Sequence, residues 1–169
     1  MNSKHVIFGI VFLFSLLLMT GAVRDERDSS EAFGVGDVLP GIKSLASVSD
    51  EATDMPAEYM LVHFWASYDG ESRAENIRWQ NFFASAEKVR NLVAYRAVSL
   101  DPDPAVYRRT ASIDGLDKER QSHIGLFAEK IHAGQLHALS KSFHTYLVDK
   151  HGVIRAVDPS PLFPAKRLK

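Results

Sequence analysis

The stretch YMLVHFWASYDGESR, residues 59–73, decides the fold of this 169-residue chain. Its first part, residues 60–65, is mostly apolar, and Ser67, Asp69 and Gly70 interrupt it before a helical pattern starts. A short apolar run followed by turn residues is typical of a strand that is buried on both faces. The stretch therefore predicts a central strand over residues 59–65 that leads through a tight turn into a helix.

Residues 61–73 also resemble the active-site segment of the thioredoxin superfamily, especially its TlpA/ResA-like branch, which faces a membrane or the periplasm. In that branch Phe-Trp-Ala, any residue and an aromatic residue precede Cys-Gly-Pro-Cys-Arg. The positions that match are Trp65, Ala66, Tyr68, Gly70 and Arg73. Asp69 and Ser72 stand where the two cysteines belong, and Glu71 replaces the proline. The resemblance implies an α/β fold, a thioredoxin-like three-layer sandwich with a mixed central sheet and helices on both faces.

Two further segments resemble the same branch, in the same order along the chain. Gly36 and Pro40 match the Gly-x-x-x-Pro entry of these domains, and residues 146–154, YLVDKHGVI, match their Tyr-Leu-Ile-Asp-x-x-Gly-x-Ile hairpin. The resemblance therefore covers residues 36–157. The prolines in residues 158–169 exclude the long closing helix of the family.

The pattern between these segments supports this architecture. Apolar residues at helical spacing predict a helix over residues 71–90, and residues 92–100 predict the next strand, which gives a βαβ unit with a parallel pair. Asp103 followed by Pro104 predicts a helix start, with the helix running to residue 113 and Gly115 near its end. Residues 116–125 are ambiguous, and residues 126–139 are mostly helical in pattern. Residues 143–149 and 153–157 predict an antiparallel hairpin.

The chain divides into four parts on composition. Residues 1–22 have a basic start, an apolar stretch and the small residues Gly21 and Ala22, which predicts a cleaved signal peptide; an uncleaved signal anchor is the alternative. Residues 23–32 predict a flexible tether, residues 33–158 the thioredoxin-like domain, and residues 159–169 a Pro-rich basic tail. We therefore expect an exported, periplasmic or cell-envelope protein that contacts a membrane only through its N-terminal segment.

Charge and cysteine content exclude two classes of function. With 20 basic and 21 acidic residues the chain has no electrostatic signature of nucleic-acid binding. It contains no cysteine, and thiol–disulfide exchange requires an attacking thiolate. The chain as written is therefore not expected to be a functional thiol–disulfide oxidoreductase.

The remaining site residues have structural interpretations. Asp69 is expected to cap the helix, Ser72 to bond to Asp69 or the backbone, and His63 to be a buried, hydrogen-bonded core residue. A Ser72–His63–Asp69 triad is conceivable but lacks a nucleophile elbow. Phe143 falls at the position of the cis-proline of the family, and an apolar contact with Trp65 and Tyr68 is expected there.

We expect neither a cofactor nor a metal site. Asp69, Glu71 and Glu75 do not have the spacing of a calcium loop, and His132 and His137 are five residues apart, which is not a same-face helical spacing. These residues are expected to be ordinary surface polar groups.

The leading hypothesis is a redox-inactive module that binds another envelope protein or a peptide. Its binding groove would consist of Trp65, Tyr68, Gly70 and Phe143, since aromatic residues are favoured at interface hot spots. The alternatives are a non-redox enzyme that uses Asp69 with Ser72 or His63, and a structural envelope protein.

Overall fold

The computed structural model describes residues 33–47, 57–126 and 128–160. The sequence-based expectations for residues 1–32 and 161–169, which include the signal, the tether and most of the tail, lie outside these residues. Among the described residues, no helix has the length and apolar character needed to cross a membrane.

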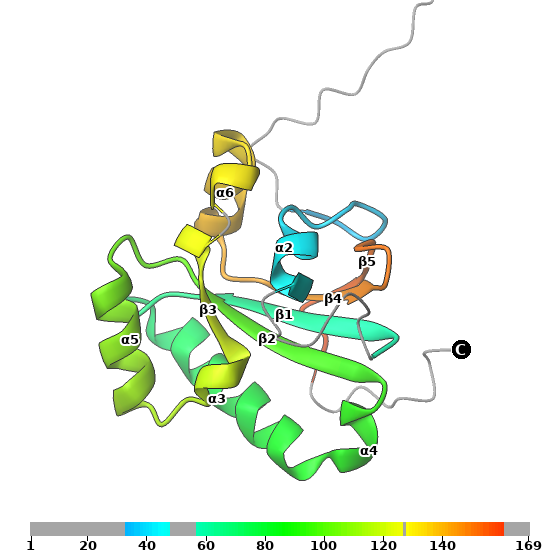
Figure 1. The fold of residues 1–169 in the computed structure, drawn as a ribbon, viewed down its shortest axis with the longest axis horizontal. Helices are drawn as coiled ribbons and strands as arrows, with labels where there is room; N and C mark the ends of the chain where they lie inside the picture. The colour runs from blue at the N-terminus through cyan, green and yellow to red at the C-terminus, as the bar shows by residue number, and fades with distance from the viewer. Residues whose placement is uncertain (1–32, 48–56, 127, 161–169) are drawn as a thin grey trace, which may run out of the picture.

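A five-stranded mixed sheet organises the domain, with the strand order β3-β2-β1-β4-β5 (Figure 1). β1 (Tyr59–Trp65) is central and pairs in parallel with β2 (Val93–Ser99), which in turn pairs in parallel with β3 (Gln121–His123). On the other side β1 pairs antiparallel with β4 (Thr145–Asp149), and β4 pairs antiparallel with β5 (Ile154–Val157). The predicted central strand, parallel pair and hairpin are thus confirmed.

Helices cover both faces of this sheet (Figure 1). α3 (Gly70–Ser85) and α5 (Pro104–Ile113) lie on one face, and α2 (Ile42–Ser47) and α6 (Ala133–Lys141) lie on the other. Successive side chains of a strand point to opposite faces, so β1 contributes to two cores. Met60, Val62 and Phe64 belong to the cluster on the α2 and α6 side, whereas Leu61 and Trp65 belong to the cluster on the α3 and α5 side.

The prediction of one long helix over residues 71–90 is wrong at its C-terminal end. α3 stops at Ser85, Ala86 leaves the helical conformation with φ −100° and ψ 67°, and a separate short helix, α4 (Glu87–Arg90), follows. The backbone N–H of Ala86 still donates to Phe82 O, which closes the last turn of α3. The break lets the chain reverse toward β2.

The region between α5 and α6 differs most from its prediction. The ambiguous residues contain a 3₁₀ turn, η1 (Lys118–Arg120), then β3 and a second turn, η2 (Ile124–Leu126). The helix expected to start at residue 126 begins only at Ala133, after a third turn, η3 (Ala128–Lys130). β3 is short and polar, and it is held by its pairing with β2 rather than by any apolar pattern of its own.

Candidate functional site

The turn after β1 carries the two positions that correspond to the missing cysteines. Asp69 is the N-cap of α3, and its Oδ1 accepts a hydrogen bond from the backbone N–H of Ser72 at 2.7 Å. This confirms the predicted cap, which satisfies one of the free N–H groups of the helix start. The side chain of Asp69 is therefore engaged in holding α3.

Ser72 is buried, with 3% of its surface exposed. Its hydroxyl donates to the carbonyl of Asp69 at 3.2 Å and accepts from the backbone N–H of Ala66 at 3.3 Å. The hydroxyl thus ties the end of β1 to the first turn of α3. Within the part of the chain that the structure describes, no hydrogen bond joins it to the ring of His63.

His63 lies on β1, fully buried beneath this turn. Its Nε2 is 2.9 Å from the carbonyl oxygen of Ser72, and its Nδ1 is 2.9 Å from Oγ1 of Thr145 on β4. A carbonyl only accepts, so Nε2 carries a proton and the Nδ1 of a neutral ring accepts from Thr145. Since the histidine contacts the Ser72 carbonyl and not its hydroxyl, the conceivable Ser72–His63–Asp69 triad is not assembled.

Burial controls the charge of this histidine. Desolvation lowers the pKa of His63 below its usual value of 6.5, against the opposing effects of the Ser72 carbonyl and of the negative charge of Glu75. The ring is therefore neutral at neutral pH. The hydroxyl of Thr145 has a single proton, which it shares between Nδ1 of His63 and Oε1 of Glu75, 3.3 Å away. His63 is a buried, hydrogen-bonded member of the core, as predicted, and it bridges the helix start and β4.

Two aromatic side chains, one exposed and one partly buried, pack together after the turn that follows β1. Tyr68 has 68% of its surface exposed, and its ring packs edge-on against that of Phe143, with 6.0 Å between the ring centroids. Phe143 is partly buried against the core on the α2 and α6 side. The peptide bonds of the described residues, including those of Phe143, are trans. The predicted contact between Tyr68 and Phe143 is confirmed, and we call these two residues the aromatic patch.

Trp65 is not part of this patch, which corrects the expected groove. Trp65 has 0% of its surface exposed, and its ring contacts Tyr107 of α5 edge-on at 6.1 Å. It belongs to the core on the α3 and α5 side, whereas Phe143 packs on the opposite side of the sheet. The alternation of side chains along β1 turns Trp65 inward, so only Tyr68, Gly70 and Phe143 of the predicted set reach the surface.

A carboxylate that the sequence did not single out holds the same turn from the other side. The buried Asp101, after β2, accepts from the backbone N–H of Ser67 at 3.0 and 3.1 Å, from the hydroxyl of Ser67 at 2.5 Å and from the hydroxyl of Ser99 at 2.7 Å. The carbonyl of Asp101 accepts from Nε2 of His123, on β3, at 2.7 Å. Asp101 thus joins the carboxyl ends of all three parallel strands.

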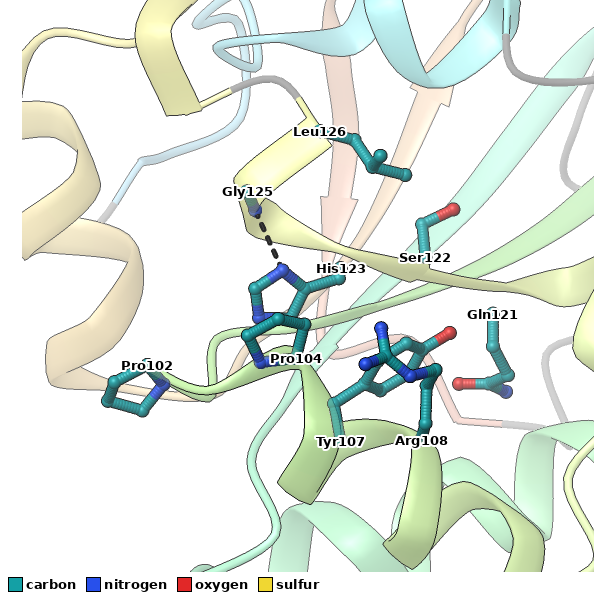
Figure 2. Close-up of a pocket in the computed structure, with 9 residues that line it drawn as sticks. All are labelled: Pro102, Pro104, Tyr107, Arg108, Gln121, Ser122, His123, Gly125 and Leu126. Carbon is teal, nitrogen blue, oxygen red and sulfur yellow. Dashed lines mark hydrogen bonds between the residues drawn. The ribbon is translucent and has the colours of Figure 1, made fainter.

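A pocket of about 540 Å³ opens beside this junction, between the start of α5 and β3 (Figure 2). The residues that shape it include Pro102, Pro104, Tyr107, Arg108, His123 and Leu126. None of them was predicted as a site residue. The pocket lies at the carboxyl ends of the parallel strands, which is where open α/β sheets commonly bind ligands.

His123 forms a fixed wall of this pocket. Its Nδ1 accepts from the backbone N–H of Gly125 at 3.1 Å, so its Nε2 is the nitrogen that donates to Asp101. A Cβ atom at Gly125 would lie 2.9 Å from this Nδ1, which explains why the smallest residue occupies the position. Because both ring nitrogens make hydrogen bonds, the ring of His123 is held in a fixed orientation.

Histidine and carboxylate side chains are scattered over the part of the chain that the structure describes. The described residues contain no group of three or more His, Asp or Glu side chains able to hold an ion. His144 pairs with Asp158 at 2.7 Å, and His132 is the N-cap of α6.

Fold and site together define the class of this chain: it has a thioredoxin-like fold, with Asp69 and Ser72 at the positions of the two cysteines and no cysteine anywhere in the sequence. Its structural neighbours are thioredoxin-like thiol–disulfide oxidoreductase family members. A scan against protein-family models finds no match, and a search among curated proteins finds none either.

Three solved structures document the likeness. A thioredoxin-like protein from Parabacteroides distasonis is 28% identical, with a TM-score of 0.61, over 82% of this chain and 97% of that one. The thioredoxin domain of a thiol–disulfide oxidoreductase from Bacteroides vulgatus is 18% identical, with a TM-score of 0.53, over 81% of this chain and 98% of that one. A thiol–disulfide oxidoreductase from Bacteroides fragilis is 23% identical, with a TM-score of 0.51, over 66% of this chain and 82% of that one.

Proposed function

We propose that this chain is a redox-inactive thioredoxin-like module that binds a segment of another protein through the aromatic patch. Two of its structural neighbours are named thiol–disulfide oxidoreductases, but this chain has no cysteine with which to form or break a disulfide. The loss of thiols leaves the turn itself intact, because Asp69 caps α3 and Ser72 ties β1 to it. A well-formed turn without redox groups favours a binding role.

The observation that carries the proposal is the exposed ring of Tyr68, held in place by Phe143. Tyrosine gives a large contact area at a low cost in conformational entropy, and it is enriched among residues that dominate binding energy. The backbone below Tyr68 is fixed by Asp69 and by the contact of Ser67 with Asp101, so the ring is presented on a rigid support. A partner would pack an apolar side chain against this pair.

The alternative of a non-redox enzyme has less support. The hydroxyl of Ser72 is buried and bonded to the backbone, and His63 bonds to a carbonyl and to Thr145. Neither is arranged as a nucleophile with its base. The remaining alternative, a purely structural envelope protein, predicts no selective binding at the aromatic patch, and the experiment below distinguishes it.

The redox part is tested by reduction of insulin disulfides in the presence of a reductant. We expect the rate of the buffer alone. Turnover above that rate would contradict the redox-inactive assignment.

The binding part is tested with a random peptide library displayed on phage, selected on the purified chain. We expect enriched peptides whose affinity falls about tenfold or more in Tyr68→Ala and in Phe143→Ala, as for hot-spot residues. Ile113→Ala is the matched control. Ile113 is 71% exposed on α5, so its replacement removes exposed apolar surface away from the aromatic patch. Unchanged affinity in both patch variants, or no enrichment, would show that the patch is not a peptide-binding surface.

Export is proposed on the basis of residues 1–22, whose basic start, apolar stretch and small residues at 21 and 22 are typical of a secretory signal. Expression of the full chain in a bacterium, followed by mass spectrometry of the envelope fraction, tests this. We expect an N-terminus at residue 23, and recovery of the chain in the cytoplasm would contradict export.

A further inference from the structure

The pocket between α5 and β3 has walls suited to an apolar group. The ring of Tyr107 lies against that of His123, with 5.6 Å between centroids and 33° between planes, and Trp65 supports Tyr107 from the core side. The ring of Pro104 and the side chain of Leu126, 63% exposed, complete the apolar lining. The volume of about 540 Å³ falls within the usual range for small-molecule sites.

Most polar side chains around the pocket already have partners. The amide of Gln121 exchanges two hydrogen bonds of 3.1 Å with the amide of Asn76, and both ring nitrogens of His123 are bonded. Ser122 points to the opposite side of β3 from Gln121 and His123 (Figure 2), as alternation along a strand requires. Gln121 and His123 therefore have little capacity left for a ligand, whereas the buried hydroxyl of Ser122 has no hydrogen-bond partner among the described residues but lies on the far side of β3.

On the side of β3 that Gln121 and His123 face, two adjacent polar groups remain: the phenol of Tyr107 and the guanidinium of Arg108. Figure 2 draws the two side chains next to one another, and the charge of Arg108 acts on the phenol. Neither makes a hydrogen bond or an ion pair with the residues that the structure describes. Burial raises the pKa of the Tyr107 phenol above its usual value of 10, although Arg108 opposes the shift. At neutral pH the phenol is therefore protonated and able to donate.

The charge balance of the pocket favours an anion. Arginine has five N–H donors, no acceptor and a permanent positive charge. None of the described residues that line the pocket carries a carboxylate. The nearby Asp103 is the N-cap of α5, and its side chain accepts from the backbone N–H of Ala105 at 2.7 Å.

We propose that this pocket binds a small monocarboxylate that carries an aromatic or bulky aliphatic group. The carboxylate receives hydrogen bonds from the Arg108 guanidinium and the Tyr107 hydroxyl, and the apolar group lies against Pro104 and Leu126. Arginine and carboxylate match in shape and charge, which gives charge-assisted, often paired hydrogen bonds. This site is separate from the aromatic patch, and its test does not depend on peptide binding.

Isothermal titration calorimetry of the full chain with N-acetylphenylalanine tests the proposal. Four further probes separate the contribution of the negative charge from that of the apolar group: N-acetylphenylalanine amide, benzyl alcohol, acetate and inorganic phosphate. We expect the acid to bind at least tenfold more tightly than its amide, because a bond to a charged group is worth more than one to a neutral group. Acetate, phosphate and benzyl alcohol should each bind more weakly than the acid, since each lacks one half of the ligand.

Three variants locate the site. Arg108→Gln and Tyr107→Phe should each weaken binding of the acid about tenfold or more, because each removes a hydrogen bond to the charged carboxylate. Arg109→Gln is the matched control, a neighbouring exposed arginine that does not line the pocket, and it should bind like the unmodified chain. Thermal unfolding of each variant confirms that it is folded.

Four results would overturn the proposal. The first three are absence of binding by the acid at millimolar concentration, equal binding of acid and amide, and equal weakening by Arg108→Gln and Arg109→Gln. Tighter binding of phosphate than of N-acetylphenylalanine would also overturn it, because the pocket would then select charge alone.

Discussion

The aromatic patch and the pocket lie on either side of the same turn, yet they differ in chemistry. Tyr68 and Phe143 form an aromatic pair of one exposed and one partly buried ring, whereas the pocket contains a guanidinium and a phenol without partners among the described residues. An aromatic pair suits contact with a protein surface, and a pocket with a positive charge suits a small anion. The two proposed sites therefore call for different ligands.

The two regions nevertheless share their supports. Trp65 ends the strand that leads to Tyr68 and also packs behind Tyr107. Asp101 holds Ser67, next to the patch, and His123, in the pocket wall. Changes at these supports should affect both regions, whereas changes at the helix caps should affect one region each.

Trp65→Ala should destabilise both regions most. Removing a fully buried tryptophan from the core costs about 3–5 kcal/mol of unfolding free energy, because apolar contacts are lost and a cavity remains. Urea denaturation measures the change. Tyr68→Ala serves as the control and should cost less than about 1 kcal/mol, since most of its ring is already exposed. A loss below 1 kcal/mol for Trp65→Ala would contradict its place in the core.

Asp101→Ala should have the next largest effect. The substitution leaves the Ser67 N–H and the hydroxyls of Ser67 and Ser99 without their acceptor, at a cost of about 2–4 kcal/mol. Asp101→Asn keeps one acceptor oxygen and should lose about half as much. Amide chemical shifts should change at both Tyr68 and His123 in Asp101→Ala. Shifts confined to one of the two regions would show that Asp101 does not join them.

His63 should make stability depend on pH. Its pKa is lowered in the folded state by desolvation, so the unfolded chain takes up the proton first as the pH falls. The free energy of unfolding should therefore be highest above about pH 6.5 and fall below it, by at most about 1.4 kcal/mol per pH unit for this group.

The matched variants are His63→Gln and His137→Gln. His63→Gln should flatten the pH dependence below pH 6.5, measured by urea denaturation at several pH values. His137→Gln alters an exposed histidine on α6 and should leave the slope unchanged. Equal slopes in His63→Gln and the unmodified chain would assign the dependence to other groups.

The two helix caps should give the smallest effects. Asp69 caps α3 below the patch and Asp103 caps α5 beside the pocket, each through a hydrogen bond of 2.7 Å. Replacement by alanine should cost about 1–2 kcal/mol at Asp69, where the bond is partly buried, and about 0.5–1 kcal/mol at the exposed Asp103. Urea denaturation measures both, and the Asp→Asn variants should lose little. A larger loss of unfolding free energy in Asp103→Ala than in Asp69→Ala would contradict this prediction.

Sequence reasoning succeeded where the controlling interactions are local. The central strand over residues 59–65 follows from an apolar run next to turn residues, and the start of α5 follows from Asp103 and Pro104. It failed at β3, whose three residues are polar. That strand is held by pairing with β2 and by the contact of Gln121 with Asn76, which lies 45 residues earlier in the chain. No local pattern contains such a contact.

The class of fold, the absence of cysteine and the capping role of Asp69 could be predicted from the sequence, because each depends on residue identity or on neighbours within a few positions. The burial of Trp65, the joining of three strands by Asp101 and the pocket beside Tyr107 and Arg108 could not. These features depend on which face of the sheet a side chain reaches and on which distant segments pack there. Both are set by the assembly of the whole sheet with its helices.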